Sequence, residues 1–276
     1  MSPVVIGLAL FAALLHASWN AFLRSGADRL WTVTVMSISG TLVGLPLAFV
    51  TPLPDPAAWI YILLSSVLQV CYTLLLVTAY RHGQLSQVYP VMRGTVPLLV
   101  TLGGFVLTGQ PVAPLQLLGV ALVAAGIMSL AIGHDRTSLR SLLLAFATGA
   151  VIATYVTVDA VGVRMSANSV AYTVWVLIGY GLLLPAVFVS TRGRIAIDLR
   201  VADTWKALAG GLVAMVAYGV VMAAFALGPA GPITALRETS VIFAVLIGWG
   251  FLGESLSLRR ILACLVVVAG AICLGG

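Results

Sequence analysis

The stretch RGTVPLLVTLGGFVLTGQPVAPLQLLGVALVAAGIMSL, residues 93–130, recurs without a gap as RETSVIFAVLIGWGFLGESLSLRRILACLVVVAGAICL, residues 237–274. Ten of the 38 aligned positions are identical. An apolar composition raises the number of chance matches, but arginine and glycine are rarer letters here. Their matches, such as Arg93 with Arg237 and Gly126 with Gly270, carry most of the weight. An internal repeat on this scale indicates a chain built from two similar halves.

The composition indicates whether these halves fold in water or in a membrane. Of the 276 residues, 61% are hydrophobic and only 8% are charged, whereas soluble domains carry about 25% charged residues. The chain therefore cannot cover a water-facing surface, and we predict an all-α integral membrane protein in contact with the lipid bilayer. The net charge of +6 does not indicate nucleic-acid binding, because the basic residues are dispersed among short loops.

Apolar runs of about 20 residues, the length that crosses a bilayer as a helix, recur along the whole chain. They predict ten transmembrane helices at 3–23, 30–50, 57–80, 85–108, 114–133, 139–162, 169–190, 205–227, 232–252 and 258–275. The repeat then divides the chain into five-helix halves at 1–134 and 139–276. Five is odd, so the second half enters the membrane upside down. Inverted repeats of this kind are typical of transporters with a substrate site near the midplane between the halves.

Basic residues are concentrated in the loops that follow the odd-numbered helices, and only Arg164 falls on the opposite side. The concentrated set comprises Arg24, Arg29, Arg81, Arg136, Arg140, Arg192, Arg194, Arg200, Lys206, Arg259 and Arg260. Because basic loops face the cytoplasm, we predict both termini on the outer side of a bacterial-type inner membrane. The first apolar run has no basic region before it and is long enough to span, so we expect no removable signal peptide.

Several stretches resemble the drug/metabolite transporter superfamily, within its ten-helix EamA family. These are HASWNAFLRSG near residue 16, YPVMRGTVPLLV near residue 93, the stretch from Leu107 to Leu130, and the stretch from Leu236 to Leu274. The glycine–glutamate pair of the pattern is kept at Gly253–Glu254 but is Gly109–Gln110 in the first half. The resemblance covers essentially the whole chain. It implies a transporter, not an enzyme, and makes export of amino acids, aromatic ones among them, the leading function.

Four charged residues fall deep within the predicted spans, where charge is costly and usually faces a cavity or the bundle interior. They are Arg93, Asp159, Arg237 and Glu238. One interpretation is mutual ion pairing that locks the halves together. The other is a cationic site for a substrate carboxylate, which the planar guanidinium fork suits. The two can coexist if substrate or proton competes for the same ion pair.

Tyr89 lies four residues before Arg93, so the two side chains share a helix face. Pro90 and Pro97 each remove a backbone donor and predict a kink in this helix. Freed carbonyl groups in mid-membrane are tolerated against protein or a wet cavity, so we expect the helix to line the central pathway.

Polar and aromatic side chains also recur at helical spacing in other predicted spans, where the alternative to cavity lining is ordinary packing. The first span carries His16, Trp19 and Asn20, and its counterpart carries Tyr155 and Asp159, although Asp159 could instead pair with Arg164 or reach water. The third and eighth spans contribute tyrosines. The complete candidate binding set is His16, Trp19, Asn20, Tyr72, Tyr80, Tyr89, Arg93, Tyr155, Asp159, Tyr218, Arg237 and Glu238.

No phosphate-cradling loop, metal-ligand spacing or catalytic cluster is visible, so the sequence predicts no cofactor, no metal and no catalytic residue. Of these candidates, the deep groups that could carry a proton are His16, Asp159 and Glu238. We therefore predict a secondary transporter working by alternating access, with a monomer sufficient for the path and protons a candidate coupling ion. A passive facilitator or channel is the alternative, and a membrane-embedded enzyme is a weaker one.

Overall fold

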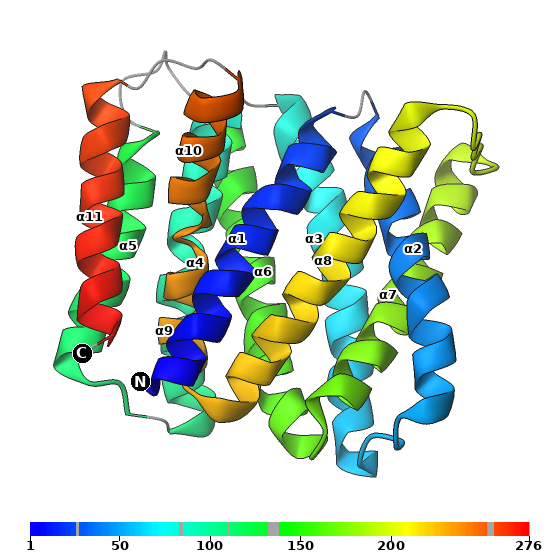
Figure 1. The fold of residues 1–276 in the computed structure, drawn as a ribbon, viewed down its shortest axis with the longest axis horizontal. Helices are drawn as coiled ribbons and strands as arrows, with labels where there is room; N and C mark the ends of the chain where they lie inside the picture. The colour runs from blue at the N-terminus through cyan, green and yellow to red at the C-terminus, as the bar shows by residue number, and fades with distance from the viewer. Residues whose placement is uncertain (26–27, 83–84, 110, 132–137, 253–256, 276) are drawn as a thin grey trace.

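The computed structural model describes residues 1–25, 28–82, 85–109, 111–131, 138–252 and 257–275. Within these ranges, side chains are described except at 20–25, 80–82, 85–87, 107–108, 247–248 and 250–252. The described chain is helical throughout (Figure 1), with one short 3₁₀ turn, Pro56–Ala58, before α3. The helices are α1 Pro3–Ser25, α2 Arg29–Val50, α3 Trp59–His82, α4 Leu85–Thr108, α5 Pro114–Ser129, α6 Leu139–Met165, α7 Ser169–Arg192, α8 Ala202–Leu227, α9 Ala230–Arg237, α10 Ser240–Leu252 and α11 Leu258–Gly275.

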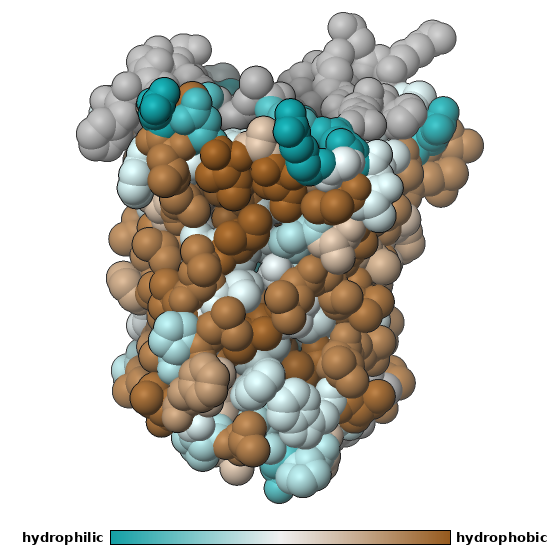
Figure 2. Space-filling model, turned by 90° about the vertical axis from the view of Figure 1, so that its right-hand side faces the viewer, coloured by the Kyte–Doolittle hydropathy of each residue, from teal (hydrophilic) through white to brown (hydrophobic). Residues whose placement is uncertain are grey.

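The outside of the bundle is apolar. Large hydrophobic side chains are exposed along most helices, among them Phe49 on α2, Phe105 on α4 and Ile272 on α11. Such patches far exceed what a water-soluble protein exposes, and Figure 2 shows them as a brown belt with teal at both ends, deepest at one of them. In the described ranges, six helical segments are long and apolar enough to cross a bilayer, and two shorter apolar helices accompany them. These features indicate a multi-pass membrane protein.

Each of the ten predicted helices has a counterpart, but the ninth is broken. Instead of one helix over 232–252, the structure has α9 and α10, with a turn at Glu238 and Thr239 between them. The amide of Thr239 donates to the carbonyl of Leu236 at 3.1 Å, and that of Val241 donates to Glu238 at 3.2 Å. These tighter i to i−3 bonds replace the α-helical ones. Conversely, α4 continues as a helix through Pro90 and Pro97.

Both termini lie at the same end of the bundle (Figure 1), as an even number of crossings requires. Corresponding helices of the two halves also have corresponding neighbours. Helix α1 packs on α8 while α6, its counterpart, packs on α3. Two other large contacts join a helix to its own counterpart, α2 to α7 and α5 to α11, and α4 also packs extensively on α6.

The α5–α11 contact depends on glycines. A Cβ atom on Gly126 would lie 2.8 Å from Val267 and 3.1 Å from the Ala263 carbonyl. A Cβ atom on Gly270 would lie 2.8 Å from both Val123 and the Gly119 carbonyl. Small residues let membrane helices approach this closely.

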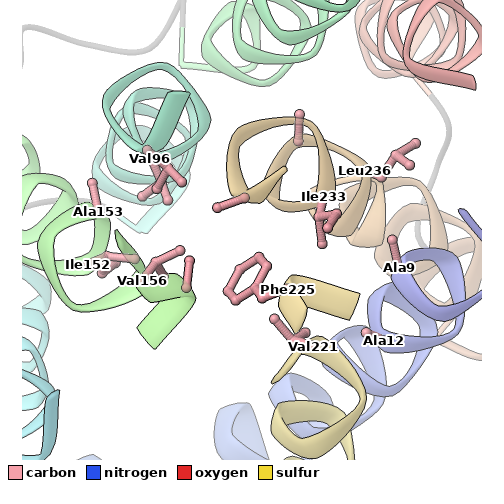
Figure 3. Close-up of a cluster of buried hydrophobic side chains, with 14 of the residues drawn as sticks. Ala9, Ala12, Val96, Ile152, Ala153, Val156, Val221, Phe225, Ile233 and Leu236 are labelled. Atoms are coloured by element: carbon pink, nitrogen blue, oxygen red, sulfur yellow. The ribbon is translucent and has the colours of Figure 1, made fainter. Parts of the chain in front are cut away.

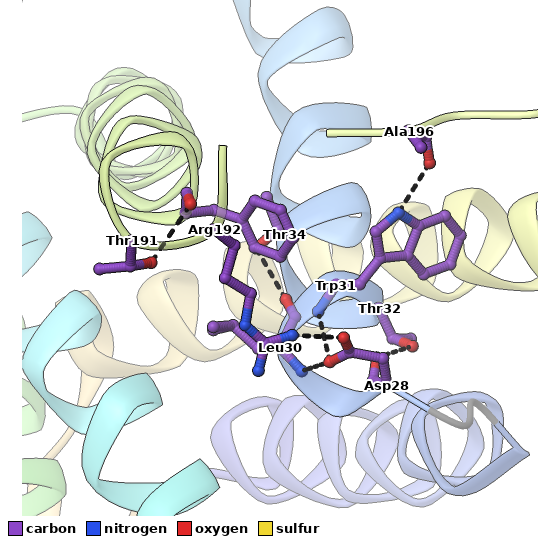
Figure 4. A network of polar contacts seen from close by, with 9 residues as sticks. Asp28, Leu30, Trp31, Thr32, Thr34, Thr191, Arg192 and Ala196 are labelled. Carbon is purple, nitrogen blue, oxygen red and sulfur yellow. Dashed lines mark hydrogen bonds and ion pairs between the residues drawn. The ribbon is translucent and has the colours of Figure 1, made fainter. Parts of the chain in front are cut away.

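At the end opposite the termini, α2 and α7 are joined by a polar cluster (Figure 4). The Asp28 carboxylate caps α2 by accepting from the amides of Leu30 and Trp31 at 3.1 and 3.2 Å, and it pairs with Arg192 at the end of α7. The Trp31 indole donates to the Ala196 carbonyl at 2.9 Å. At the other end of α7, Asn168 caps the helix in the same way, accepting from Val170 and Ala171 at 3.0 Å each.

At the end that holds the termini, a hydrophobic cluster fills the centre of the bundle (Figure 3). The Phe225 side chain of α8 points between α6 and α9, where it lies between Val156 and Ile233. Phe225 and Ile233 are both 0% exposed. This plug separates the middle of the bundle from the end that holds the termini.

Candidate functional site

A cavity of about 160 Å³ lies between the helices above this plug. One water molecule needs only about 15 Å³ on the same measure, so the cavity can hold a small solute. Its walls come from α1, α2, α3, α4, α6, α7, α8 and α9, and thus from both halves. On α8 the lining runs from Gly211 to Val221, one turn short of Phe225. The cavity therefore extends from the plug toward the opposite end of the bundle, where the α7–α8 loop carries the basic residues Arg194 and Arg200. This end is called the end with the basic loops.

Two arginines line the cavity and share one carboxylate. Arg93 of α4 donates to Glu238 Oε1 at 3.2 Å, and Arg237 at the end of α9 donates to the same oxygen at 3.1 Å. The side chains of Arg93 and Glu238 are 5% and 2% exposed. The break between α9 and α10 places Glu238 at a helix end, where its side chain can reach both guanidinium groups. The trio carries a net charge of +1.

This pairing leaves donors of both guanidinium groups unsatisfied. The Nε atoms of Arg93 and Arg237 are buried without a hydrogen-bond partner, and a buried donor left unpaired is costly. Because both residues line the cavity, the trio is suited to bind an additional anionic group. The structural and the substrate-binding interpretations of these arginines are therefore compatible.

His16 of α1 connects Arg93 to the aromatic wall. Its Nε2 atom contacts the Arg93 guanidinium, and its Nδ1 atom lies 3.2 Å from the indole nitrogen of Trp19. A neutral imidazole has only one acceptor nitrogen, so His16 can accept from one of these two donors at a time. The edge of Trp19 meets the His16 ring at a centroid distance of 5.0 Å. His16 thus lies between a cation and an aromatic side chain of the cavity.

A buried carboxyl group that forms no ion pair within the described residues contacts the cavity lining through Tyr218. Asp159 is 0% exposed and accepts hydrogen bonds from the hydroxyls of Tyr172 at 3.0 Å and Tyr218 at 2.9 Å. Arg164 instead donates to the carbonyl groups of Phe225 and Gly228. The alternative in which Asp159 pairs with Arg164 or reaches water is therefore not what the structure has, because Arg164 caps the end of α8 and Asp159 is 0% exposed.

The predicted site residues separate into three groups. Seven of them line the cavity directly: His16, Trp19, Tyr72, Arg93, Tyr155, Tyr218 and Arg237. Glu238, Asp159 and Tyr89 are outside the lining but contact it. Glu238 does so through both arginines, Asp159 through Tyr218, and Tyr89 through its ring 5.5 Å from the Arg93 guanidinium carbon. The side chains of Asn20 and Tyr80 lie outside the described part of the structure.

Other lining residues were not among the predicted candidates. Helix α2 contributes Val33, Met36, Ser37 and Gly40, and α7 contributes Leu177 and Tyr180. The repeat could have indicated them, because Ser37 and Gly40 precede Leu177 and Tyr180 by the same 140 residues that separate the caps Asp28 and Asn168. Gln69 of α3 also lines the cavity, where its amide lies 3.0 Å from Ser65 and 3.5 Å from the Tyr218 hydroxyl.

None of the curated proteins matches this chain. A solved crystal structure, titled only as that of a protein, superposes with a TM-score of 0.73 at 16% sequence identity, over 98% of this chain and 94% of that chain. This likeness shows a shared fold. The model of the EamA-like transporter family matches residues 4–132 and again residues 139–276. The chain therefore belongs to the EamA-like transporter family, whose members are multi-pass membrane transporters of small molecules and not enzymes.

Proposed function

We propose that this transporter exports amino acids, aromatic ones among them, or similar small metabolites by alternating access between two inverted halves. The observation that carries the proposal is the arginine pair in the shared cavity. Two arginines line a space that both halves enclose, each with a buried Nε donor that has no partner, and a carboxylate is the acceptor that suits guanidinium donors. Tyrosine and tryptophan side chains form apolar walls with polar tips, which suit an aromatic or aliphatic side chain.

The inverted relation of the halves is supported by the α5–α11 contact. Gly126 meets Val267, and Gly270 meets Val123. In the sequence repeat Gly126 corresponds to Gly270 and Val123 to Val267, so exchanging the halves turns one contact into the other. A twofold axis in the membrane plane relates contacts in this way.

Alternating access is supported by the plug at one end of the cavity. Phe225 and Ile233 close the end that holds the termini, while the lining continues toward the end with the basic loops. With these loops in the cytoplasm, the cavity faces inward in this conformation and both termini are outside. Closure at the basic end would then convert it to the outward-facing form, and one chain would suffice for the path.

Counterflow into liposomes tests the proposal. Vesicles preloaded with one unlabelled amino acid should transiently concentrate the labelled form, and a panel of amino acids would identify the substrates. Absence of counterflow with every amino acid would overturn the amino-acid assignment. Flux without saturation or counterflow would favour a channel.

The arginine pair can be tested in the same assay. Arg93→Met should weaken substrate binding at least tenfold, because a charge-assisted hydrogen bond contributes about 1.5–3 kcal/mol. Arg194→Met removes an exposed arginine of the α7–α8 loop and should leave counterflow unchanged. Full transport and unchanged affinity in the Arg93 variant would refute the carboxylate-binding role.

A further inference from the structure

We propose that Asp159 is the proton-exchange site of this transporter, where a proton competes with the ammonium group of a zwitterionic substrate through Tyr218. The inference rests on the proposed function and deepens it. It assigns the substrate class, an amino acid with both charges, and the coupling, one proton moved opposite to one substrate molecule.

The geometry of the carboxyl group carries the inference. A carboxylate at membrane depth normally has a cationic partner, yet within the described residues none lies within ion-pair distance of Asp159. Both oxygens accept from phenol hydroxyls instead. Tyr172 is 0% exposed, while Tyr218 lines the cavity. Tyr218 is thus the link between the buried acid and the transport path.

The groups around Asp159 come from every element packed on α6. From α3 come Ser65, within hydrogen-bonding reach, and Tyr61, beside Tyr172. Helix α7 brings Tyr172, α8 brings Tyr218, and Tyr155 is on α6 itself. Helix α9 brings Arg237, whose charge reaches Asp159 although it is paired with Glu238. Helix α4 brings Arg93 and Tyr89, which lie together at the arginine pair, and the 3₁₀ turn Pro56–Ala58 has no titratable side chain.

The cavity therefore has two poles of opposite charge. Arg93, Arg237 and Glu238 together carry +1, and ionised Asp159 carries −1. An amino acid with its carboxylate at the arginines and its ammonium group near Tyr218 matches both poles and leaves the net charge of the cavity at zero. A metabolite with only one of the charges would match only one pole.

The proton acts through the single hydrogen of the Tyr218 hydroxyl. While Asp159 is ionised, this hydrogen is donated to Oδ2. The phenol oxygen then accepts only the long 3.5 Å contact from the Gln69 amide among the hydrogen bonds of the described residues, and an ammonium group in the cavity can donate to it in place of that amide. When a proton binds Oδ2, the new acid O–H donates to the phenol oxygen instead. The hydroxyl hydrogen of Tyr218 then turns toward the cavity, where it opposes a cation. No bond within Tyr218 breaks, and the proton returns to water when the substrate binds.

The exchange follows from this exclusion. A carrier loaded with substrate has no proton on Asp159, and a carrier that has lost its substrate can take one. Export of one zwitterion is then balanced by import of one proton, which uses a proton gradient directed inward. Linkage requires the effect to be reciprocal, so that acid weakens substrate binding and substrate releases a proton.

Binding measurements with two matched ligands test the proposal. L-phenylalanine carries both charges, whereas 3-phenylpropionate lacks the ammonium group. For the wild-type protein in detergent, the apparent Kd for phenylalanine should rise as pH falls from 8 to 6, by up to about tenfold per pH unit, the limit for one competing proton. The Kd for 3-phenylpropionate should not rise. If another amino acid gives the counterflow signal, that amino acid and its deaminated form replace the pair.

Two variants locate the effect. Asp159→Asn keeps the size of the side chain and removes its proton exchange. The variant should bind phenylalanine more weakly than the wild-type protein does at pH 8, and its own Kd should be the same at pH 6 as at pH 8. Tyr172→Phe removes the other hydroxyl and keeps the Asp159–Tyr218 contact, so the pH dependence should persist. Retention of the full pH dependence by Asp159→Asn would overturn the proposal. So would a pH-independent Kd in the wild-type protein, a measurement that needs no variant.

Proton release in weakly buffered liposomes separates this inference from the proposed function. Net transport of phenylalanine down its gradient together with alkalinisation of the compartment that the proton leaves supports both. Intact counterflow with net phenylalanine transport that moves no proton overturns the role of Asp159 and leaves the exporter assignment standing. Absence of counterflow with every amino acid overturns the exporter assignment itself.

Discussion

Replacement of Glu238 by glutamine should destabilise the protein strongly, because one carboxylate holds two buried arginines. Its Oε1 atom is 3.2 Å from Arg93 and 3.1 Å from Arg237, and the side chain is 2% exposed. Removing one partner of a buried ion pair typically costs about 3–5 kcal/mol, since it leaves an uncompensated charge. Here two guanidinium groups lose their common anion, so the upper part of that range is expected. At about 2–4 °C per kcal/mol for a chain of this size, the melting temperature should fall by roughly 8–20 °C.

The chain provides a matched control in an exposed ion pair. Asp203 and Lys206 form a pair of similar length, 3.0 Å, but their side chains are 48% and 47% exposed. Asp203→Asn should cost no more than about 1 kcal/mol. Thermal unfolding in detergent, followed by tryptophan fluorescence, gives both values under one condition. Equal losses for Glu238→Gln and Asp203→Asn would refute the argument that burial, and not the pairing distance, determines the cost.

A double-mutant cycle checks that the loss comes from the ion pair. With Arg93→Met added, Glu238→Gln should cost less than in the wild-type protein, because one of the two stranded cations is gone. A coupling of at least about 1 kcal/mol is expected for residues in direct contact. Strict additivity of the two substitutions would contradict the shared-carboxylate description.

Three further predictions concern packing and helix ends, each measured as thermal stability against a matched control. Gly270→Ala should cost about 1–3 kcal/mol, because the added methyl group meets the Gly119 carbonyl at 2.8 Å and the Val123 amide at 2.9 Å. Gly7→Ala has nothing within 4 Å and should be neutral or slightly stabilising, so equal losses at the two glycines would contradict the close α5–α11 contact. Phe225→Ala should cost about 3–5 kcal/mol as a buried truncation, whereas Phe105→Ala, on a side chain 60% exposed, should cost far less; similar costs would argue against the plug. Asp28→Ala and Asn168→Ala should each lose an N-cap worth about 0.5–2 kcal/mol. The loss for Asp28→Ala should exceed that for Asn168→Ala by no more than about 1 kcal/mol, because the ion-pair partner of Asp28, Arg192, is 31% exposed. A much larger difference would mean that the Asp28–Arg192 pair is more than a surface contact.

Much of the fold was predictable because the bilayer imposes a simple rule on the sequence. A helix must be apolar over about 20 residues to cross, so the breaks between runs are visible as short polar stretches, and the observed helices begin and end close to the expected positions. The break after Arg237 was not predictable in this way. No proline or glycine occupies position 238 or 239, and the partner of Glu238 outside its own helix, Arg93, lies 145 residues away in the sequence.

The candidate site was predictable where rare residue types marked it. Charge at membrane depth is costly, so Arg93, Arg237 and Glu238 were recognisable from their positions within apolar runs of the sequence. The structure brings them into contact. Residues such as Ser37, Gly40 and Leu177 are common in membrane helices, and only their position on a helix face makes them part of the cavity. The partners of Asp159 were not predictable either, because Tyr172 and Tyr218 come from two other helices.

Accessibility of one cavity position from each side of the membrane tests alternating access most directly. With the three native cysteines replaced by alanine, Ala214→Cys places a thiol in the cavity wall of α8, and Val216→Cys places one on a residue of the same helix that is 44% exposed and outside the lining. In liposomes of known orientation, a membrane-impermeant thiol reagent should reach Cys at 214 from the side with the basic loops, and from the other side at a rate that substrate changes. The control position should react at a rate that substrate does not change. Labelling of position 214 from one side only, with or without substrate, would contradict transport through this cavity.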